Sequence, residues 1–258
     1  MKINKIEKLK NGKYKIVFDK DSIETFDNVI LDNNLLYKNN VDSDLYDSIV
    51  NDTIYYEIYN KVIKYIMKKR RSEKEIREYL LKFSLSKENI NKMILKLKNN
   101  KLINDIDYCK AFINDSLYLG NKGINNIRKE LLNQEISAEV VENELRNIDN
   151  KLFNDKLEKL VKKKIQLNKK HSNNYLKQKL LNELLELGYD RYDIINVIDS
   201  NLNTNDYIIL KKEFEKTYTK LEKKYNGYDL QRNVKNKMLS RGFNINEIEL
   251  LLKEKTEK

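Results

Sequence analysis

The chain has 258 residues, of which 40% are hydrophobic and 35% are charged, and its formal net charge is +11. A single cysteine excludes an internal disulfide, and a single histidine argues against His-based metal sites and His-dependent catalysis. Absent proline and only six glycines argue against β-sandwiches and glycine-rich phosphate loops. No apolar run approaches a membrane span of roughly 18 residues, and Met1–Lys5 lacks the start of a signal peptide. We therefore expect a cytoplasmic, cofactor-free binding protein that meets a polyanion or an acidic protein surface.

Residues 1–53 predict a small α+β N-terminal cap with a β-hairpin. The pair Asn11-Gly12 tolerates positive φ and is a strong hairpin signal between two apolar stretches. About 50 residues bury too little apolar surface for stability alone, so we expect the cap to pack on its neighbour. The expected elements are strands at 2–9, 14–18 and 23–26 and short helices at 27–33 and 42–51.

After Asp52 the pattern is helical and repeats four times, which decides the architecture. The reference positions are Ser84, Glu135, Gly188 and Gly242, and each is followed by an apolar residue. Apolar residues recur eight and four positions before each reference and six and ten positions after it, so they mark one face on each of two helices. The two glycines suit left-handed helix C-caps. A further amphipathic helix precedes each pair, so we expect tandem three-helix repeats stacked in an elongated array. The predicted repeats are 54–107, 108–150, 151–205 and 206–258.

Two ordered motifs lie in the first two repeats. The first is Lys69-Arg70-Arg71-Ser72-Glu73-Lys74-Glu75-Ile76-Arg77-Glu78-Tyr79-Leu80. The second comprises Leu102-Ile103-Asn104-Asp105, Asp107-Tyr108, Ala111-Phe112, Gly120-Asn121-Lys122-Gly123 and Ile127-Arg128-Lys129-Glu130-Leu131. With these motifs the chain resembles the RecX family, bacterial proteins that modulate the RecA recombinase. The chain departs from the family pattern at Cys109-Lys110, at Asn125-Asn126, and at Ser84 and Glu135, where glycine is usual.

The resemblance implies a regulator that binds the RecA–single-stranded-DNA filament and so acts in DNA repair, recombination and the SOS response. It implies a monomer that is not an enzyme, and contact with single-stranded DNA either directly or through the filament. The residues alone leave a helix-turn-helix transcription regulator as the alternative. That function needs side chains that read base edges, whereas the presumed reading helices carry mostly Glu, Lys and Asn.

The candidate binding residues are basic side chains near helix entrances. Residues 54–107 carry 14 basic and 7 acidic residues, the largest basic excess of any segment. Such clusters clamp phosphates or acidic partner residues, or form a solvated face without a partner. Ser72 and Glu75 predict a capping box, Cys109 predicts a small core residue, and His171 predicts a polar loop without a metal. The candidates for partner or DNA binding are Arg70, Arg71, Arg77, Lys122, Arg128 and Lys129.

Overall fold

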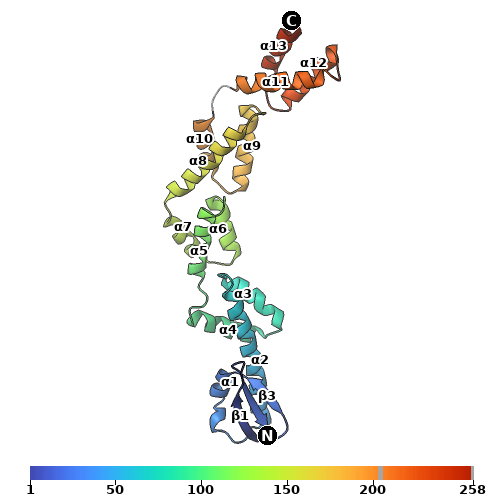
Figure 1. Ribbon diagram of the computed structural model, residues 1–258. Coiled ribbons are helices and arrows are strands. Elements are labelled where there is room, and N and C mark those ends of the chain that lie inside the picture. The colour runs from blue at the N-terminus through green and yellow to red at the C-terminus, as the bar shows by residue number, and fades with distance from the viewer. Residues whose placement is uncertain (203–205, 257–258) are drawn as a thin grey trace. The chain divides into compact units, whose positions relative to one another are not determined.

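The computed structural model describes residues 1–202 and 206–256 (Figure 1). The chain divides into two compact units, Met1–Tyr108 and Cys109–Lys258. The predicted limit between the third and fourth repeats, at residue 205, lies outside the described residues. The strands are β1 (Ile3–Lys8), β2 (Tyr14–Phe18) and β3 (Ser22–Thr25), and the helices of the first unit are α1 (Asp27–Asp32), α2 (Ser43–Ile66), α3 (Glu73–Leu80) and α4 (Lys87–Asn99). The remaining helices are α5 (Asp105–Tyr118), α6 (Ile124–Asn133), α7 (Ala138–Arg146), α8 (Asn150–Leu167), α9 (Asn173–Glu186), α10 (Arg191–Asn201), α11 (Tyr207–Leu221), α12 (Gly227–Leu239) and α13 (Ile245–Thr256).

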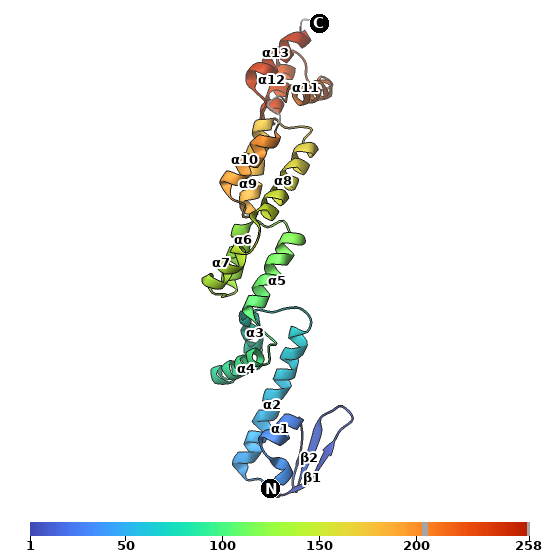
Figure 2. The same cartoon turned by 90° about the vertical axis from the view of Figure 1, so that its left-hand side faces the viewer.

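The N-terminal cap is an antiparallel sheet in the order β1-β2-β3, which confirms the predicted hairpin. Gly12 has φ +84°, the left-handed conformation that the Asn-Gly signal predicts. Figure 2 shows β1 and β2 beside α1 and the first half of α2. The core of the cap comes from the inward residues of β2, from α1 and from α2. Its buried members include Ile16, Phe18, Val29, Ile30, Ile49 and Tyr56.

Helix α2 runs without a break through residue 53, so the helix expected at 42–51 and the amphipathic helix expected at the start of the first repeat are one. The run Asn51-Asp52-Thr53 is polar, yet it lies inside the helix. Thr53 is satisfied inside the helix: its hydroxyl donates to the Ile49 carbonyl at 2.7 Å and pairs with the Thr25 hydroxyl at 2.6 Å. Ile49 packs in the cap core and Val62 in the core of the first repeat. One helix therefore ties the cap to the first repeat.

The apolar repeat positions form the cores of the three-helix repeats, as the periodicity predicts. Positions eight and four before each reference, and six and ten after it, are buried in every repeat. In the third repeat the paired positions lie on α9 and α10, and both helices pack with α8. The buried set is Ile76, Leu80, Ile90, Ile94, Ile127, Leu131, Val141, Leu145, Leu180, Leu184, Ile194, Ile198, Val234, Met238, Ile248 and Leu252.

All four reference positions adopt the left-handed conformation, including the two that are not glycine. Their φ angles are +52° at Ser84, +61° at Glu135, +87° at Gly188 and +85° at Gly242. A side chain in this conformation costs about 1–2 kcal/mol. The first two repeats therefore keep the same turn as the last two although they lack the residue that suits it.

Within the second unit, each of two joints places the start of one repeat's second helix on the left-handed turn of the next repeat. Gly123, the N-cap of α6, donates its N–H to the Leu187 carbonyl at 2.7 Å, and Asn125 N donates to the Gly188 carbonyl at 3.0 Å. At the next joint Ser172, the N-cap of α9, donates its N–H to the Arg241 carbonyl at 3.0 Å. Neighbouring repeats are thus coupled through backbone hydrogen bonds, as a nearest-neighbour array requires.

Candidate functional site

Arg71 lies at the turn from α2 into α3 and is held by internal contacts. Its guanidinium carbon lies 3.9 Å from the centroid of the Tyr65 ring, which stacks on Tyr79 at 4.2 Å. Its Nη1 donates to Glu75 Oε1 at 3.0 Å, and only 13% of its side chain is exposed. Glu75 also completes the predicted capping box with Ser72. Cation–π contact and ion pairing place Arg71 as a link between α2 and α3.

Arg70 is exposed at the same turn. Its Nη1 donates to the Asp107 backbone carbonyl at 3.3 Å. With Arg71 and residues 101–104 it lines a cavity of about 190 Å³. Among the described residues its hydrogen-bond partner is a neutral carbonyl, so the charge of Arg70 is available to an external anion.

Arg77 and Arg128 occupy the same repeat position, seven residues before the reference, and each bonds to the residue 14 positions later on the next helix. Arg77 Nη1 donates to Asn91 Oδ1 at 2.8 Å, and Arg128 Nε donates to Glu142 Oε1 at 2.6 Å. Lys235 pairs with Glu249 at the same two positions of the fourth repeat. In the third repeat both positions are apolar: Leu181 is buried in the core, and Ile195 is partly buried and packs against it. This position links the second and third helices of a repeat.

The carboxylates that pair with Arg77 and Arg128, those of Glu73 and Glu142, have lowered pKa values. Burial raises the pKa of Glu73, but hydrogen bonds from Lys98 and Arg77 outweigh it, and the pKa ends below the ordinary value. The hydrogen bond from Arg128 lowers the pKa of Glu142. Both carboxylates are therefore ionised at neutral pH and partly neutralise the arginines.

Lys122 and Lys129 differ in accessibility. Lys122 pairs with Glu130, and its ammonium lies 5.4 Å from the Phe112 ring centroid. Lys129 is exposed and has no ion-pair partner among the described residues.

The six candidates fall into two clusters. Arg70, Arg71 and Arg77 belong to the first unit, and Lys122, Arg128 and Lys129 belong to the second. Of the six candidates, Arg70 and Lys129 remain open to a partner.

Sequence reasoning missed a row of lysines along α8. Residues 150–170 carry eight lysines and two acids, Asp155 and Glu158. Lys156 donates to the carbonyls of Ser116 and Leu117 at 2.8 and 2.7 Å, so it caps the end of α5, and burial lowers its pKa. Lys162 pairs with Glu158 at 2.6 Å. The lysines that are exposed and lack an ion-pair partner in the described part of the chain are Lys151, Lys159, Lys163, Lys169 and Lys170.

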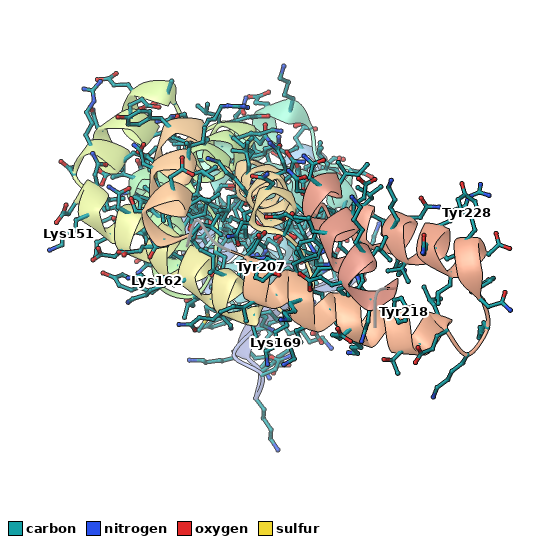
Figure 3. All side chains as sticks on the ribbon, turned by 90° about the horizontal axis from the view of Figure 1, so that it is seen from above. Lys151, Lys162, Lys169, Tyr207, Tyr218 and Tyr228 are labelled. Atoms are coloured by element: carbon teal, nitrogen blue, oxygen red, sulfur yellow. The ribbon has the colours of Figure 1, made fainter. Side chains whose placement is uncertain are left out.

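Figure 3 shows Lys151, Lys162 and Lys169 following one another along the outer side of this segment. At 100° per residue, Lys151, Lys159, Lys162 and Lys163 fall on one side of the helix, opposite the buried residues Phe153 and Leu157. The signal was present in the sequence, but averaging over residues 151–205 dilutes it.

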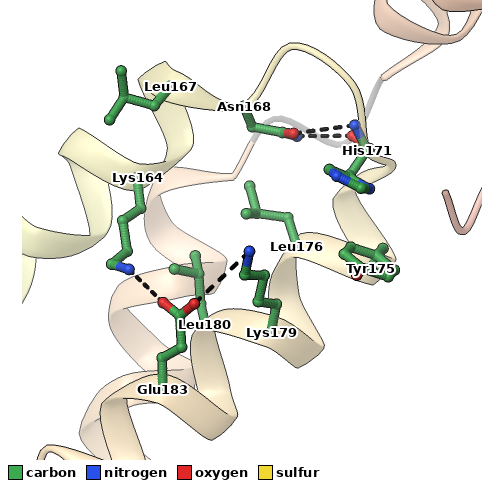
Figure 4. Close-up of a pocket in the computed structure, with 9 residues that line it drawn as sticks. All are labelled: Lys164, Leu167, Asn168, His171, Tyr175, Leu176, Lys179, Leu180 and Glu183. Atoms are coloured by element: carbon green, nitrogen blue, oxygen red, sulfur yellow. Dashed lines mark hydrogen bonds and ion pairs between the residues drawn. The ribbon is translucent and has the colours of Figure 1, made fainter.

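A cavity of about 220 Å³ lies between the C-terminal end of α8 and α9 (Figure 4). At one side, Glu183 pairs with both Lys164 and Lys179. At the other, the His171 ring stacks on Tyr175 at 4.4 Å and 12°. The remaining lining residues are Leu167, Asn168, Leu176 and Leu180.

His171 is held in place by its backbone, while its ring keeps an unused polar atom. The Asn168 side chain accepts from His171 N at 3.1 Å and donates to its carbonyl at 2.8 Å. The ring nitrogen Nδ1 of His171 is buried and has no hydrogen-bond partner in the described structure. Burial, with the charges of Lys179 and Arg241, lowers the pKa of His171, so the imidazole is neutral at pH 7.

Two further properties bear on the class of protein. Within residues 1–202 and 206–256, no three His, Cys, Asp or Glu side chains gather to hold a metal ion. None of the helices in that part of the chain is both long and apolar enough to cross a membrane. The fold is that of a helical-repeat protein, and the candidate binding groups that remain exposed on it are basic side chains.

Comparison with known proteins identifies the family. The chain is 33% identical over 204 residues to regulatory protein RecX of Streptococcus agalactiae, covering 76% of each chain, and 29% identical over 202 residues to that of Streptococcus gordonii. A crystal structure of regulatory protein RecX superposes with a TM-score of 0.68 at 20% identity, covering 77% of this chain and all of the other. RecX from Lactobacillus salivarius gives a TM-score of 0.52 at 26% identity, over 57% of this chain and 95% of the other. No protein-family model matches the chain. The chain belongs to the RecX family, as its motifs indicate.

Proposed function

We propose that this protein binds the RecA–single-stranded-DNA filament and modulates the recombinase, and thereby regulates DNA repair and recombination. The observation that carries the proposal is the 33% identity to a regulatory protein RecX over 76% of both chains. Tandem repeats support it, because successive similar repeats can meet successive subunits of a helical target. Direct contact with the single strand is part of the proposal.

The protein acts as a binding protein and not as an enzyme, in the cytoplasm and as a monomer. In this proposal its effect on RecA comes from occupying the filament. The basic side chains that remain exposed contact DNA phosphates or acidic surfaces of the filament. The helix-turn-helix alternative predicts tight binding to one duplex sequence that resists nonspecific competitor.

The test measures ATP hydrolysis by RecA on single-stranded DNA while the protein is titrated to stoichiometry. The expected result is a dose-dependent change in the hydrolysis rate, with no hydrolysis by the protein alone. An unchanged rate at stoichiometric protein contradicts the proposal. Selective binding to one duplex sequence in place of the filament supports the alternative.

A further inference from the structure

The exposed lysines of α8 lie next to the cavity that α8 shares with α9. Lys159, Lys163 and Leu167 are spaced four residues apart, so they form a ridge that advances about 6 Å per step along the helix. Leu167 lines the cavity and is 67% exposed. A chain that follows the lysines therefore reaches the cavity mouth at Leu167.

The ridge suits a polyanion. Lys159 and Lys163 are exposed and have no ion-pair partner in the described residues, whereas Lys162 and Lys164 on the same helix are ion-paired. Lys156 is engaged by two backbone carbonyls. Lys169 and Lys170 extend the positive charge beyond the end of α8. Lysines in a row contact successive phosphates of one strand without reading its sequence.

The cavity suits a flat aromatic ring with polar edges. Leu176 and Leu180 give it an apolar lining, and Tyr175, 39% exposed, offers a ring that already stacks on His171. The carboxylate of Glu183 at the cavity wall is a hydrogen-bond acceptor for the edge of a base. An acidic peptide would use the lysines but would leave the aromatic pair unused.

We propose that the third repeat is a direct binding site for single-stranded DNA, in which the α8 lysines hold the phosphates and the cavity at His171 and Tyr175 takes one unstacked base. This inference deepens the proposed function, because it assigns direct contact with the strand to one repeat. It moves the expected contact away from Arg71, Arg77 and Arg128, whose charges are paired internally.

The first experiment measures binding of fluorescein-labelled oligothymidylate to the full-length protein without RecA, by fluorescence anisotropy over a range of salt concentrations. The double substitution Lys159→Glu and Lys163→Glu should weaken binding about tenfold or more. It should also reduce the slope of log affinity against log salt by about 1.4, the value for two lost phosphate contacts on a single strand. The matched control is Lys211→Glu with Lys212→Glu, two exposed lysines on α11 in the same unit. Equal losses in the two variants would overturn the inference.

The second experiment tests the cavity. Tyr175→Leu keeps an apolar side chain but removes the ring, and should weaken oligothymidylate binding about tenfold, since stacking on one base carries about 1–3 kcal/mol. Tyr228→Leu, on α12 and 78% exposed, is the control and should leave the affinity unchanged. Photocrosslinking with an oligonucleotide that contains 5-iodouracil should label Tyr175 or His171.

Three outcomes overturn the site: wild-type affinity of Tyr175→Leu, crosslinks confined to other repeats, or competition by polyglutamate as strong as by oligothymidylate. The third outcome would identify an acidic peptide as the ligand class. Failure here is separable from failure of the proposed function. If the α8 variants bind oligothymidylate normally while wild-type protein still alters ATP hydrolysis by RecA, only this inference fails. If the site binds DNA but RecA is unaffected, only the proposed function fails.

Discussion

Replacing Gly123 by alanine tests how the repeats are joined. Gly123 has φ −80°, which any residue adopts, so the substitution introduces no backbone strain of its own. A Cβ at this position would lie 2.4 Å from the carbonyl carbon and oxygen of Gly188 and from Tyr189 N. These are backbone atoms, so the second and third repeats must move apart by about 1 Å to restore ordinary van der Waals contact.

Three hydrogen bonds hold this joint: Gly123 N to Leu187 O at 2.7 Å, Asn125 N to Gly188 O at 3.0 Å, and Asn126 Nδ2 to Glu186 O at 2.6 Å. Each contributes about 1 kcal/mol net, so we expect Gly123→Ala to lower the free energy of unfolding by about 2–4 kcal/mol. The loss is a large share of the total of about 5–15 kcal/mol typical of a domain.

The assay is equilibrium unfolding in urea, followed by circular dichroism, with amide hydrogen exchange at Tyr189 as a local probe. The control is Gly12→Ala, where the added Cβ meets no atom within 4 Å and only the φ of +84° is strained. That variant should lose about 1 kcal/mol and leave exchange at Tyr189 unchanged. Gly123→Ala with wild-type stability and exchange would refute the close packing of these repeats.

Three further predictions concern single groups. Ser84→Gly should raise the free energy of unfolding by about 0.5–1 kcal/mol, since it relieves a left-handed φ of +52°; an equally or less stable variant in urea would contradict that strain. Arg128→Met should lower stability by about 1 kcal/mol because it breaks the bond to Glu142, yet leave the effect on RecA unchanged; loss of that effect in a folded variant would make the arginine a contact residue. The sole imidazole, His171, should titrate below its ordinary pKa of 6.5 by NMR, because burial and nearby cations favour the neutral form. Because the pKa of His171 is lower in the folded than in the unfolded chain, the neutral imidazole stabilises the fold above pH 6.5, and this stabilisation is lost as the pH falls toward the folded pKa. A measured pKa above 6.5 would contradict the structure around the ring.

Much of the fold follows from sequence periodicity. Positions such as Ile127 and Leu131, four residues apart on one helix face, are buried because only that face meets the neighbouring helices. The turn at Glu135 shows the limit of residue type as a signal. Its left-handed conformation follows from its place in the repeat, since the residue itself disfavours it.

The continuity of α2 could not be predicted in the same way. A polar run at Asn51-Asp52-Thr53 resembles a helix end, and only the tertiary partner Thr25 shows that Thr53 is buried and hydrogen-bonded within the helix. Local sequence carries no information on a partner 28 residues away in the chain. The predicted division between cap and first repeat therefore falls in the middle of a helix.

The sequence predicted which basic side chains make up the candidate site, but it could not predict which of them are accessible to a partner. Sequence identifies Arg77 and Arg128 as rare basic residues, but it does not show that their guanidinium groups bond to Asn91 and Glu142 on the next helix. A signal existed, because Lys235 occupies the same repeat position with Glu249 as its partner. Comparison of polar as well as apolar positions across the repeats would have indicated a structural role for both arginines.

The proposed binding to the RecA–single-stranded-DNA filament is tested most directly by electron microscopy of filaments assembled with and without the protein. Filaments with the protein should show added density that follows the helical groove of RecA, and the protein should remain with filaments pulled down on biotinylated single-stranded DNA. Filaments identical in the two preparations, with no protein retained above the level of beads alone, would contradict the account.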